Sequence, residues 1–441
     1  MKKYALIIIL FGFIFQTSAQ QKIWSLEEAV NYALTNNLSV KQAELTTDLR
    51  NEDIVSAKGN RLPTLNASSS ESFSFGSTIN NENVRISRNR NSTSFGVASS
   101  VTLFNGFRNL NTVKQAELGH KASILDLEKM KNDISLNVVN FYLNILFSKE
   151  NIKVALEQLQ ISKLQLNKAQ QLVAEGVKPR SEVLDAEATL ANDEEKLVTA
   201  QNNLDLSLLS LAHLLQISPK YFDVQDLKLN IKSPELKYKN TDAIFDKAVA
   251  EKPEIKSAEL DVENAVLAID IAKSLYYPSL SFGYNFSTFY GHTEGMPNQL
   301  SFMDQFEDNK SHNLNLSLNI PVFNGFKTKS GVSKANINSR LASYALDNEK
   351  LKLRETIERA YTDAKAALNQ YIASEKSVLA QQESFKNSQD RYNLGAMTSF
   401  DFEQVRARLV SAQSNFINAK YNFVFKTKLL EFYYGIPIVL D

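Results

Sequence analysis

One sequence pattern occurs twice in this chain, and the repetition constrains the fold more than any single motif does. The word Leu-Phe-Asn-Gly-Phe-Arg at 103–108 returns as Val-Phe-Asn-Gly-Phe-Lys at 322–327, which is 219 residues later. Residues 176–217 match residues 395–436 at the same offset. Self-similarity on this scale indicates that the chain builds one structural unit twice. We therefore predict two repeats with the same order of elements.

The matches also define the predicted segments. Each repeat opens with a short amphipathic helix and a longer one that an X-Pro step ends, because the residue before proline is pushed out of the helical region. A Lys-rich connector with a possible strand at 227–231 separates the repeats. The short helices are predicted at 26–36 and 242–251, and the longer ones at 38–59 and 253–275. The predicted segments are a signal peptide at 1–19, repeat 1 at 20–217, the connector at 218–240 and repeat 2 at 241–441.

Each repeat next contains two segments with the period of a β-strand. Apolar and polar residues alternate strictly over 313–320, which gives a strand one apolar and one polar face. Strands of this length match the roughly 9–11 residues that a tilted strand needs to cross a bilayer. The four strands are predicted at about 64–75, 93–104, 279–290 and 313–322.

After the repeated word the period changes from two to seven. Apolar residues recur every seventh position from Val138 to Val173, and again from Ile357 to Tyr392. A sustained repeat of this kind keeps one seam facing a neighbouring helix only in a left-handed supercoil. A helix over 108–174 would be roughly 100 Å long at 1.5 Å per residue, which no compact domain needs. The long helices are predicted at about 108–174, 180–217, 327–393 and 399–435.

Composition excludes several classes of function. The chain has no cysteine, and its 49 basic residues balance its 49 acidic residues. Disulfides, thiolate catalysis and a basic surface for nucleic acid are therefore not expected. The four histidines are far apart and form no metal-binding motif. We expect no enzyme, no cofactor and no metal site.

The N-terminal residues predict export. Two lysines, an apolar run and Thr17-Ser18-Ala19 form the pattern of a secretory signal peptide. No later segment is apolar enough for a membrane helix of about 20 residues, so a membrane role would depend on the strands. Four strands cannot close, because the smallest membrane barrels have about eight and open edges are costly in hydrocarbon. Either the strands form a soluble sheet or several protomers pool them, and the residues do not choose between two, three and four copies.

The motifs together resemble those of a known family. A Phe-Asn-Gly word leads into a long heptad helix, Arg-Tyr-Asn-Leu-Gly stands at 391–395, and Asp-Phe-Glu-Gln-Val-Arg-Ala follows at 401–407. This order, present in both halves, resembles the TolC family of outer-membrane efflux proteins. The resemblance implies a homotrimer with a 12-stranded membrane β-barrel, four strands per protomer, and a 12-helix periplasmic tunnel. It also implies a passive export duct in the outer membrane of a Gram-negative bacterium, in contact with outer-membrane lipid, a periplasmic adaptor and an inner-membrane pump.

The resemblance also implies a periplasmic gate. Glu182 and Asp401 match acidic gate positions, and Tyr392 matches a tyrosine of the closing network. Met397 stands where an arginine is expected and Gln404 where a second acid is expected. The gate would therefore carry fewer charged residues than is usual in the family. The alternative interpretation is that Glu182 and Asp401 are first-turn acids stabilised by the helix macrodipole.

Two further sets of residues are predicted to form the helix turns and the strand-to-helix junctions. The helix turns are expected to contact the adaptor, and glycine there permits a positive φ. The strand-to-helix junctions need an asparagine that can cap the helix and a glycine that changes the chain direction. The turn residues are Gly176, Pro179, Gly395 and Thr398, and the junction residues are Asn105, Gly106, Asn324 and Gly325.

The competing hypothesis is a periplasmic coiled-coil adaptor or structural rod without a pore. Export and long hairpins suit it equally, but it does not explain strand pairs of membrane length in both halves. The sequence leaves open the exported substrate, small molecule or polypeptide, and also which strand face meets lipid. The aromatic residues Phe282, Tyr284, Phe286, Phe289 and Tyr290 are the expected lipid-facing belt.

Overall fold

The computed structural model describes residues 22–79, 83–87, 89–227, 231, 234–238 and 240–436. The predicted signal peptide lies outside these residues. The chain divides into two compact units. The first contains the described residues within Met1–Gln42, Lys129–Glu251 and Lys352–Asp441, and the second contains those within Ala43–Glu128 and Lys252–Leu351.

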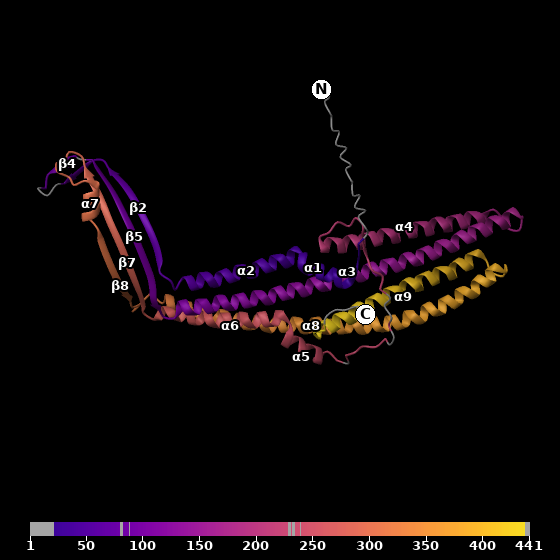
Figure 1. Ribbon diagram of the computed structural model, residues 1–441. Helices are drawn as coiled ribbons and strands as arrows, with labels where there is room; N and C mark the ends of the chain where they lie inside the picture. Colours follow the sequence, from indigo (N-terminus) through magenta and orange to yellow (C-terminus); the bar gives the residue numbers. More distant parts are fainter. Residues whose placement is uncertain are drawn as a thin grey trace, which may run out of the picture. The chain divides into compact units, whose positions relative to one another are not determined.

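An antiparallel sheet of four strands forms one end of the second unit (Figure 1). Its order is β2-β5-β7-β8, so β2 and β8 are the two edge strands. The strands are β2 (Thr64–Ser74), β5 (Arg90–Asn105), β7 (Ser279–Thr293) and β8 (Ser311–Asn319). Each of them covers most of a strand predicted from the alternating pattern. The short hairpin of β3 (Ser77–Ile79) and β4 (Arg85–Ser87) follows β2.

Strand register separates the side chains of the sheet into two different faces. Ala67, Val97 and Phe286 lie in one row, and Ser68, Gly96 and Ser287 lie in the next row on the other face. The apolar face carries Leu65, Phe95, Val101, Leu280, Phe282, Tyr284, Leu314, Leu316 and Leu318. The opposite face carries Asn66, Ala98, Ser100, Ser281, Gly283, Asn285, Asn313, Asn315 and Ser317. One face of the sheet is thus apolar, and the other face is made of small, mainly polar residues.

The predicted aromatic belt needs one correction. Phe282, Tyr284, Phe286 and Tyr290 share the apolar face, but Phe289 is opposite Ser94 and points to the polar face. The reason is the strict alternation of a strand, which places odd and even positions on opposite sides. A bulge at the other end of β5, between Thr102 and Phe104, keeps Phe104 opposite Leu280.

Each strand-to-helix junction uses two successive residues in the left-handed region. Gly106 has a φ of +64° and Phe107 of +65°, and Gly325 and Phe326 repeat this with +61° and +63°. The glycines were predicted to change the chain direction here, whereas the left-handed phenylalanines were not foreseen. In each junction the flanking phenylalanines pack edge to face, with centroids 5.4 Å apart in the first and 5.6 Å in the second.

The junction asparagines bond into the first turn of the following helix. Asn105 Oδ1 accepts a hydrogen bond of 3.2 Å from the backbone N–H of Asn109, which satisfies one of the orphan donors of the helix start. The Asn324 amide instead donates to the hydroxyl of Thr328. The predicted cap is therefore present in the first junction, and the second uses a side-chain contact.

The helices begin and end close to the predicted positions. They are α1 (Leu26–Asn36), α2 (Leu38–Gly59), α3 (Arg108–Ala174), α4 (Ser181–Leu215), α5 (Asp242–Glu251), α6 (Pro253–Lys273), α8 (Lys327–Asn393) and α9 (Ser399–Tyr433). A further short helix, α7 (Phe302–Asp308), was not predicted. Among the described residues, no helix is both long and apolar enough to span a membrane.

The first unit is built from α1, α4, α5, α9 and the adjoining parts of α3 and α8. The seven-residue apolar seam faces inward throughout this unit, since Val138, Ile145, Ile357 and Ala364 are fully buried and no seam residue is exposed. Tyr371 stacks between neighbours on α9, with ring centroids 5.6 Å from Phe416 and 5.7 Å from Phe423. These contacts are the expected side-to-side packing of supercoiled helices.

The connector strand lies earlier than predicted. Leu227 and Ile231 are not in a strand, and residues 228–230 lie outside the described part of the chain. The strand is β6 (Phe222–Val224), which pairs in parallel with β1 (Lys22–Trp24). Phe222 and Val224 are buried there. Three residues are too few for an alternating pattern to show.

Candidate gate and docking turns

Helices α3 and α4 form the first helical hairpin, and helices α8 and α9 form the second. The turns of the two hairpins have the same geometry. Gly176 has a φ of +76°, and its N–H donates to Val173 O at 3.0 Å, while Val177 N–H donates to Leu172 O at 2.9 Å. Gly395 has a φ of +72°, and it and Ala396 make the equivalent bonds of 3.1 and 2.8 Å. This is the Schellman arrangement, in which a left-handed glycine ends a helix. The predicted turn role of both glycines is therefore observed.

The return helices start differently after these turns. Thr398 caps α9, because its hydroxyl accepts a 3.1 Å bond from Asp401 N–H and donates a 2.7 Å bond to the Asp401 carboxylate. In α4 the capping position is Arg180, whose side chain makes no capping bond. Pro179 lies just before α4, and its carbonyl accepts from Glu182 N–H at 3.1 Å. Only the second hairpin has a side-chain cap.

Glu182 and Tyr392 line the same cavity, of about 390 Å³, between the two hairpins. The Tyr392 ring stacks on Phe402 with centroids 4.7 Å apart. Lys168 Nζ lies 5.1 Å from the Tyr392 ring and also donates to Asn393 Oδ1 at 3.0 Å. Burial, followed by the nearby charges of Glu182 and Glu403, raises the pKa of the Tyr392 hydroxyl. Residues from both hairpins thus meet here.

Asp401 lies in a second cavity, of about 640 Å³, which also holds Met397 and Gln404. Three basic residues line it as well: Lys178, Arg391 and Arg408. The Glu182 carboxylate pairs with Lys178 at 3.3 Å. The structure therefore brings Glu182 and Tyr392 to one cavity but places Asp401 in a neighbouring cavity that three basic residues line.

A buried charge cluster joins three helices further along the hairpins. Arg406 of α9 contacts the carboxylate of Asp193 in α4 at 2.6 Å and the hydroxyl of Ser162 in α3 at 2.8 Å. Asp193 also pairs with Lys196 at 3.1 Å, and Arg406 with Glu403 at 2.7 Å. Arg406 and Asp193 are almost wholly buried. The cluster connects the first hairpin to the second.

Sequence reasoning missed this cluster, although one signal was present. Ser162 and Asp193 follow the seam residues Leu159 and Leu190 by three positions, where a second apolar residue is expected in a heptad. Burial alone would raise the pKa of the Asp193 carboxyl. The hydrogen bonds from Ser162 and Arg406 and the charge of Arg406 outweigh it and hold that pKa below its usual value.

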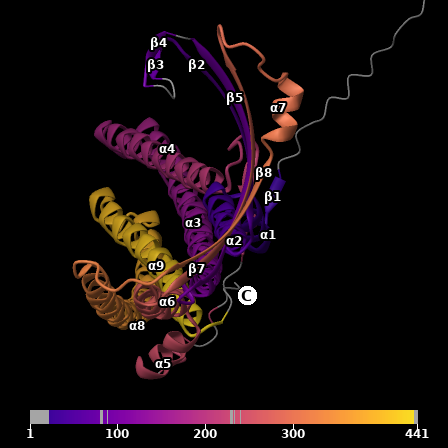
Figure 2. The ribbon, with the colours of Figure 1, turned by 90° about the vertical axis from the view of Figure 1, so that its left-hand side faces the viewer.

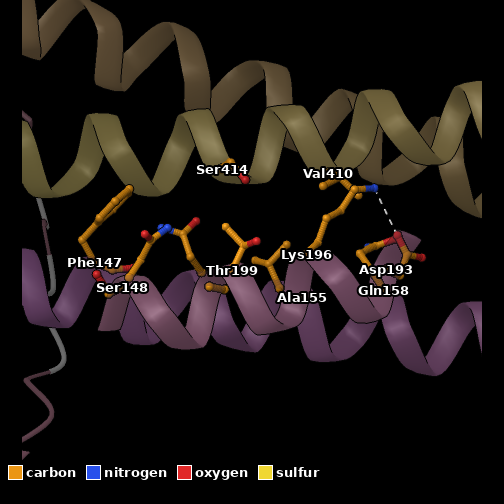
Figure 3. Close-up of a pocket in the computed structure, with 13 residues that line it drawn as sticks. Phe147, Ser148, Ala155, Gln158, Asp193, Lys196, Thr199, Val410 and Ser414 are labelled. Carbon is orange, nitrogen blue, oxygen red and sulfur yellow. Dashed lines mark hydrogen bonds and ion pairs between the residues drawn. The ribbon is translucent and has the colours of Figure 1, made fainter. Parts of the chain in front are cut away.

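A cavity of about 320 Å³ extends from this cluster between α3, α4 and α9 (Figure 3). Figure 3 shows Lys196 reaching from α4 to Asp193, with Val410 and Ser414 of α9 on the opposite wall. Its remaining polar lining consists of hydroxyl and amide side chains. In the described part of the chain, no group of three or more His, Cys, Asp or Glu side chains could hold a metal ion.

Comparison with known proteins agrees with this architecture. The family model "Outer membrane efflux protein" matches residues 29–215 and again residues 244–432. Outer membrane protein TolC of Escherichia coli K12 is 23% identical over 96% of this chain and 84% of that protein. Among solved structures, the CusC channel superposes with a TM-score of 0.80 at 17% identity, over 93% of this chain and 92% of that one. VceC of Vibrio cholerae superposes with a TM-score of 0.76 at 16% identity, over 93% and 96%.

These matches define an export channel of the outer membrane. The chain belongs to the outer membrane efflux protein family. It is a protein of the outer membrane that extends into the periplasm and serves as an efflux duct.

Proposed function

We propose that this chain forms a homotrimeric, passive exit duct of a tripartite export system, with a 12-stranded barrel and a 12-helix tunnel. The observation that carries the proposal is the sheet itself, which has one apolar face, one polar face and two open edges. An apolar outer face and a polar inner face are what a membrane barrel requires. A passive duct needs no cofactor, and the balanced charge of the chain favours no nucleic acid.

The open edges support pooling of strands between copies. Every residue of β2 and β8 is exposed, so their outer backbone groups need a partner in hydrocarbon. Four antiparallel strands per copy leave β8 of one copy antiparallel to β2 of the next, so closure continues the same pattern. Three copies of this four-stranded sheet give 12 strands. The number three rests on the family resemblance.

Two matches of one family model support the tandem repeat. We assign repeat 1 to residues 20–217 and repeat 2 to residues 241–441, with the connector at 218–240 outside them. We also assign residues 1–19 to a signal peptide that is removed on export. The two hairpins, each closed by a left-handed glycine, are then the two repeats of one wall element.

The turns are the proposed contact with the periplasmic adaptor. Exposed apolar side chains surround Gly176, Pro179, Gly395 and Thr398. Val177 is 64% exposed, Leu394 84% and Phe400 69%. Large apolar residues exposed together are typical of a protein-binding surface. The adaptor would link this surface to the inner-membrane pump, and pump and adaptor, not the duct, would select small molecules or polypeptides as cargo.

The gate is proposed at Glu182, Tyr392 and Asp401. Glu182 and Tyr392 line one cavity between hairpins, so a relative movement of the hairpins would change the distance between them. Around Asp401 the three basic residues offset its charge. The reduced acidic charge that Met397 and Gln404 predict is consistent with this mainly basic lining. Carboxylate rings at a narrow mouth favour cations, and the basic lining is expected to weaken that preference.

Conductance in planar bilayers tests the duct, and membrane fractionation tests the competing rod without a pore. We expect recovery in the outer membrane, a trimer by native mass spectrometry and steady ion conductance. Recovery in the soluble periplasm would favour the rod. For the gate, Glu182→Gln and Asp401→Asn are expected to raise conductance and lower cation selectivity, with Glu187→Gln as the control because Glu187 is exposed on α4 outside both cavities. Unchanged conductance and selectivity in both variants would reject the gate.

A further inference from the structure

The segment between β7 and β8 leaves the sheet after Thr293 and returns to it at Ser311. It contains α7, which packs back onto the sheet at the end remote from the helices (Figure 1). Figure 2 shows that the sheet is curved and that α7 lies on its convex side. Ser301 caps this helix by accepting a 3.2 Å bond from Asp304 N–H.

Amide side chains fix α7 to the free edge of β7. β8 pairs with β7 only as far as Ser287, so beyond it that edge of β7 has no neighbouring strand. Gln305 bonds both backbone groups of Gly291, at 2.9 and 3.0 Å, and Gln299 bonds both groups of Thr293, at 2.6 and 2.7 Å. Asn309 donates to Phe289 O at 2.7 Å. These amides replace a strand and close the edge to further pairing.

The inner side of α7 extends the apolar face of the sheet. Phe302 and Phe306 pack edge to face on Phe95, at 6.4 and 5.7 Å between centroids. Tyr290 lies 5.2 Å from Phe302, and the hydroxyl of Thr288 donates to Phe306 O at 2.8 Å. The aromatic residues of the helix and the strands form one continuous cluster at this level.

The outer side of α7 mixes apolar and acidic residues. Met303 is 63% exposed and Leu300, just before the helix, is 54% exposed, while Phe302 keeps 44% of its surface exposed although its ring packs on Phe95. Asp304 and Glu307 lie on the same short helix, and Glu307 pairs with Lys310 at 2.5 Å. Burial in the hydrocarbon core would be unfavourable for the carboxylates of Asp304 and Glu307, and exposure to bulk water would be unfavourable for the apolar side chains. The interface between membrane and water accommodates both kinds of side chain.

We propose that α7 is an interfacial helix that rests in the outer boundary of the membrane and binds lipid there. The inference rests on the proposed barrel. Leu280 to Tyr290 spans roughly 33 Å along β7 at about 3.3 Å per residue, or roughly 23 Å along the membrane normal at a 45° tilt. This nearly equals the apolar band of about 25 Å on such barrels. The lipid-facing band therefore ends at the level of Tyr290, where α7 lies.

Single cysteines report this position cleanly because the chain has no cysteine of its own. Met303→Cys reports α7, Leu314→Cys the middle of the apolar face and Asn315→Cys the polar face of the same strand. Each variant is labelled with a fluorophore and reconstituted as the full chain in phosphatidylethanolamine–phosphatidylglycerol vesicles. The vesicles carry a nitroxide quencher either in the headgroup or near the end of the acyl chain.

The expected pattern has three parts. The label at 303 loses more fluorescence to the headgroup quencher, the label at 314 loses more to the acyl-chain quencher, and the label at 315 loses least to either. Leu300→Cys is a second reporter and should behave as 303 does. Lipid quenching at 314 without lipid quenching at 300 or 303 would overturn the interfacial helix alone. No lipid quenching at 314 would overturn the proposed barrel itself.

Discussion

The guanidinium of Arg406 in α9 lies 2.6 Å from the carboxylate of Asp193 in α4, and both side chains are almost wholly removed from water. This pair joins one hairpin to the other at a position where heptad packing needs only apolar residues. A buried ion pair adds little stability over an apolar pair. Loss of one partner, however, leaves an uncompensated charge in the protein interior, which is strongly destabilising. The pair is therefore expected to specify how the hairpins align.

Removal of either partner should destabilise the protein strongly. Arg406→Met or Asp193→Leu is expected to cost about 3–5 kcal/mol, whereas the double variant should recover most of the loss. Denaturant unfolding in detergent measures this. Arg359→Ala is the control, because Arg359 and Glu355 form an exposed pair at 2.9 Å and such pairs contribute under about 1 kcal/mol. A double variant as unstable as the two singles combined would contradict the expected coupling.

Acid should weaken the same contact. Because the folded-state pKa of Asp193 lies below its unfolded value of about 3.9, its contribution is fully present above that value and is lost as pH falls through the folded pKa. Thermal unfolding followed from neutral pH to below pH 4 checks this. The Asp193→Asn variant should lose less of its remaining stability over that acidic range than the wild type does. Parallel curves for the two proteins would refute the linkage.

The two junction glycines should respond differently to alanine. A Cβ at Gly106 would lie 2.5 Å from Ser274 O and 2.9 Å from Tyr277 Cβ, whereas one at Gly325 would meet nothing within 4 Å. Both positions have positive φ, which costs a non-glycine residue about 1–2 kcal/mol. Gly325→Ala should show that cost alone, and Gly106→Ala should lower the stability and the yield of folded protein clearly more. Equal losses would argue against crowding at Gly106.

Glu182 should control the ionisation of Tyr392. After burial, its carboxylate is the next cause of the raised pKa of that tyrosine. Glu182→Gln should therefore move the pKa of Tyr392 down, toward the ordinary value of about 10. Tyrosine-labelled NMR titration, with Tyr392→Phe to assign the signal, measures the shift. Asp401→Asn is the matched control because Asp401 lies in the other cavity, and an equal shift in both variants would refute the shared site.

The sequence predicts the long helices well because their signal is periodic and long. The seam from Val138 to Val173 repeats over many turns, so local exceptions do not hide it. The strands of the sheet are similarly evident in their alternation. Helix α7 is different, since seven residues show no period and its position depends on amides that meet the free edge of β7. Such a helix exists because of its tertiary contacts.

The candidate gate was only partly accessible to sequence reasoning. The turn glycines follow from local backbone needs, and the structure gives both a positive φ. The separation of Asp401 from Glu182 and Tyr392 does not follow, because it depends on how two hairpins pack side by side. The Arg406–Asp193 contact spans 213 residues of sequence, and a lone polar residue in a seam indicates a partner without identifying it.

At one level of the polar face of the sheet, small side chains leave the backbone as the limit of any bore that the sheet encloses. Ser68, Gly96 and Ser287 stand in one row across three strands, and none exceeds serine in size. The calibre of such a passage depends on strand number and tilt. The calibre is therefore set by the architecture and changes little when one small residue replaces another. The chemistry of the cargo can vary without a change in calibre.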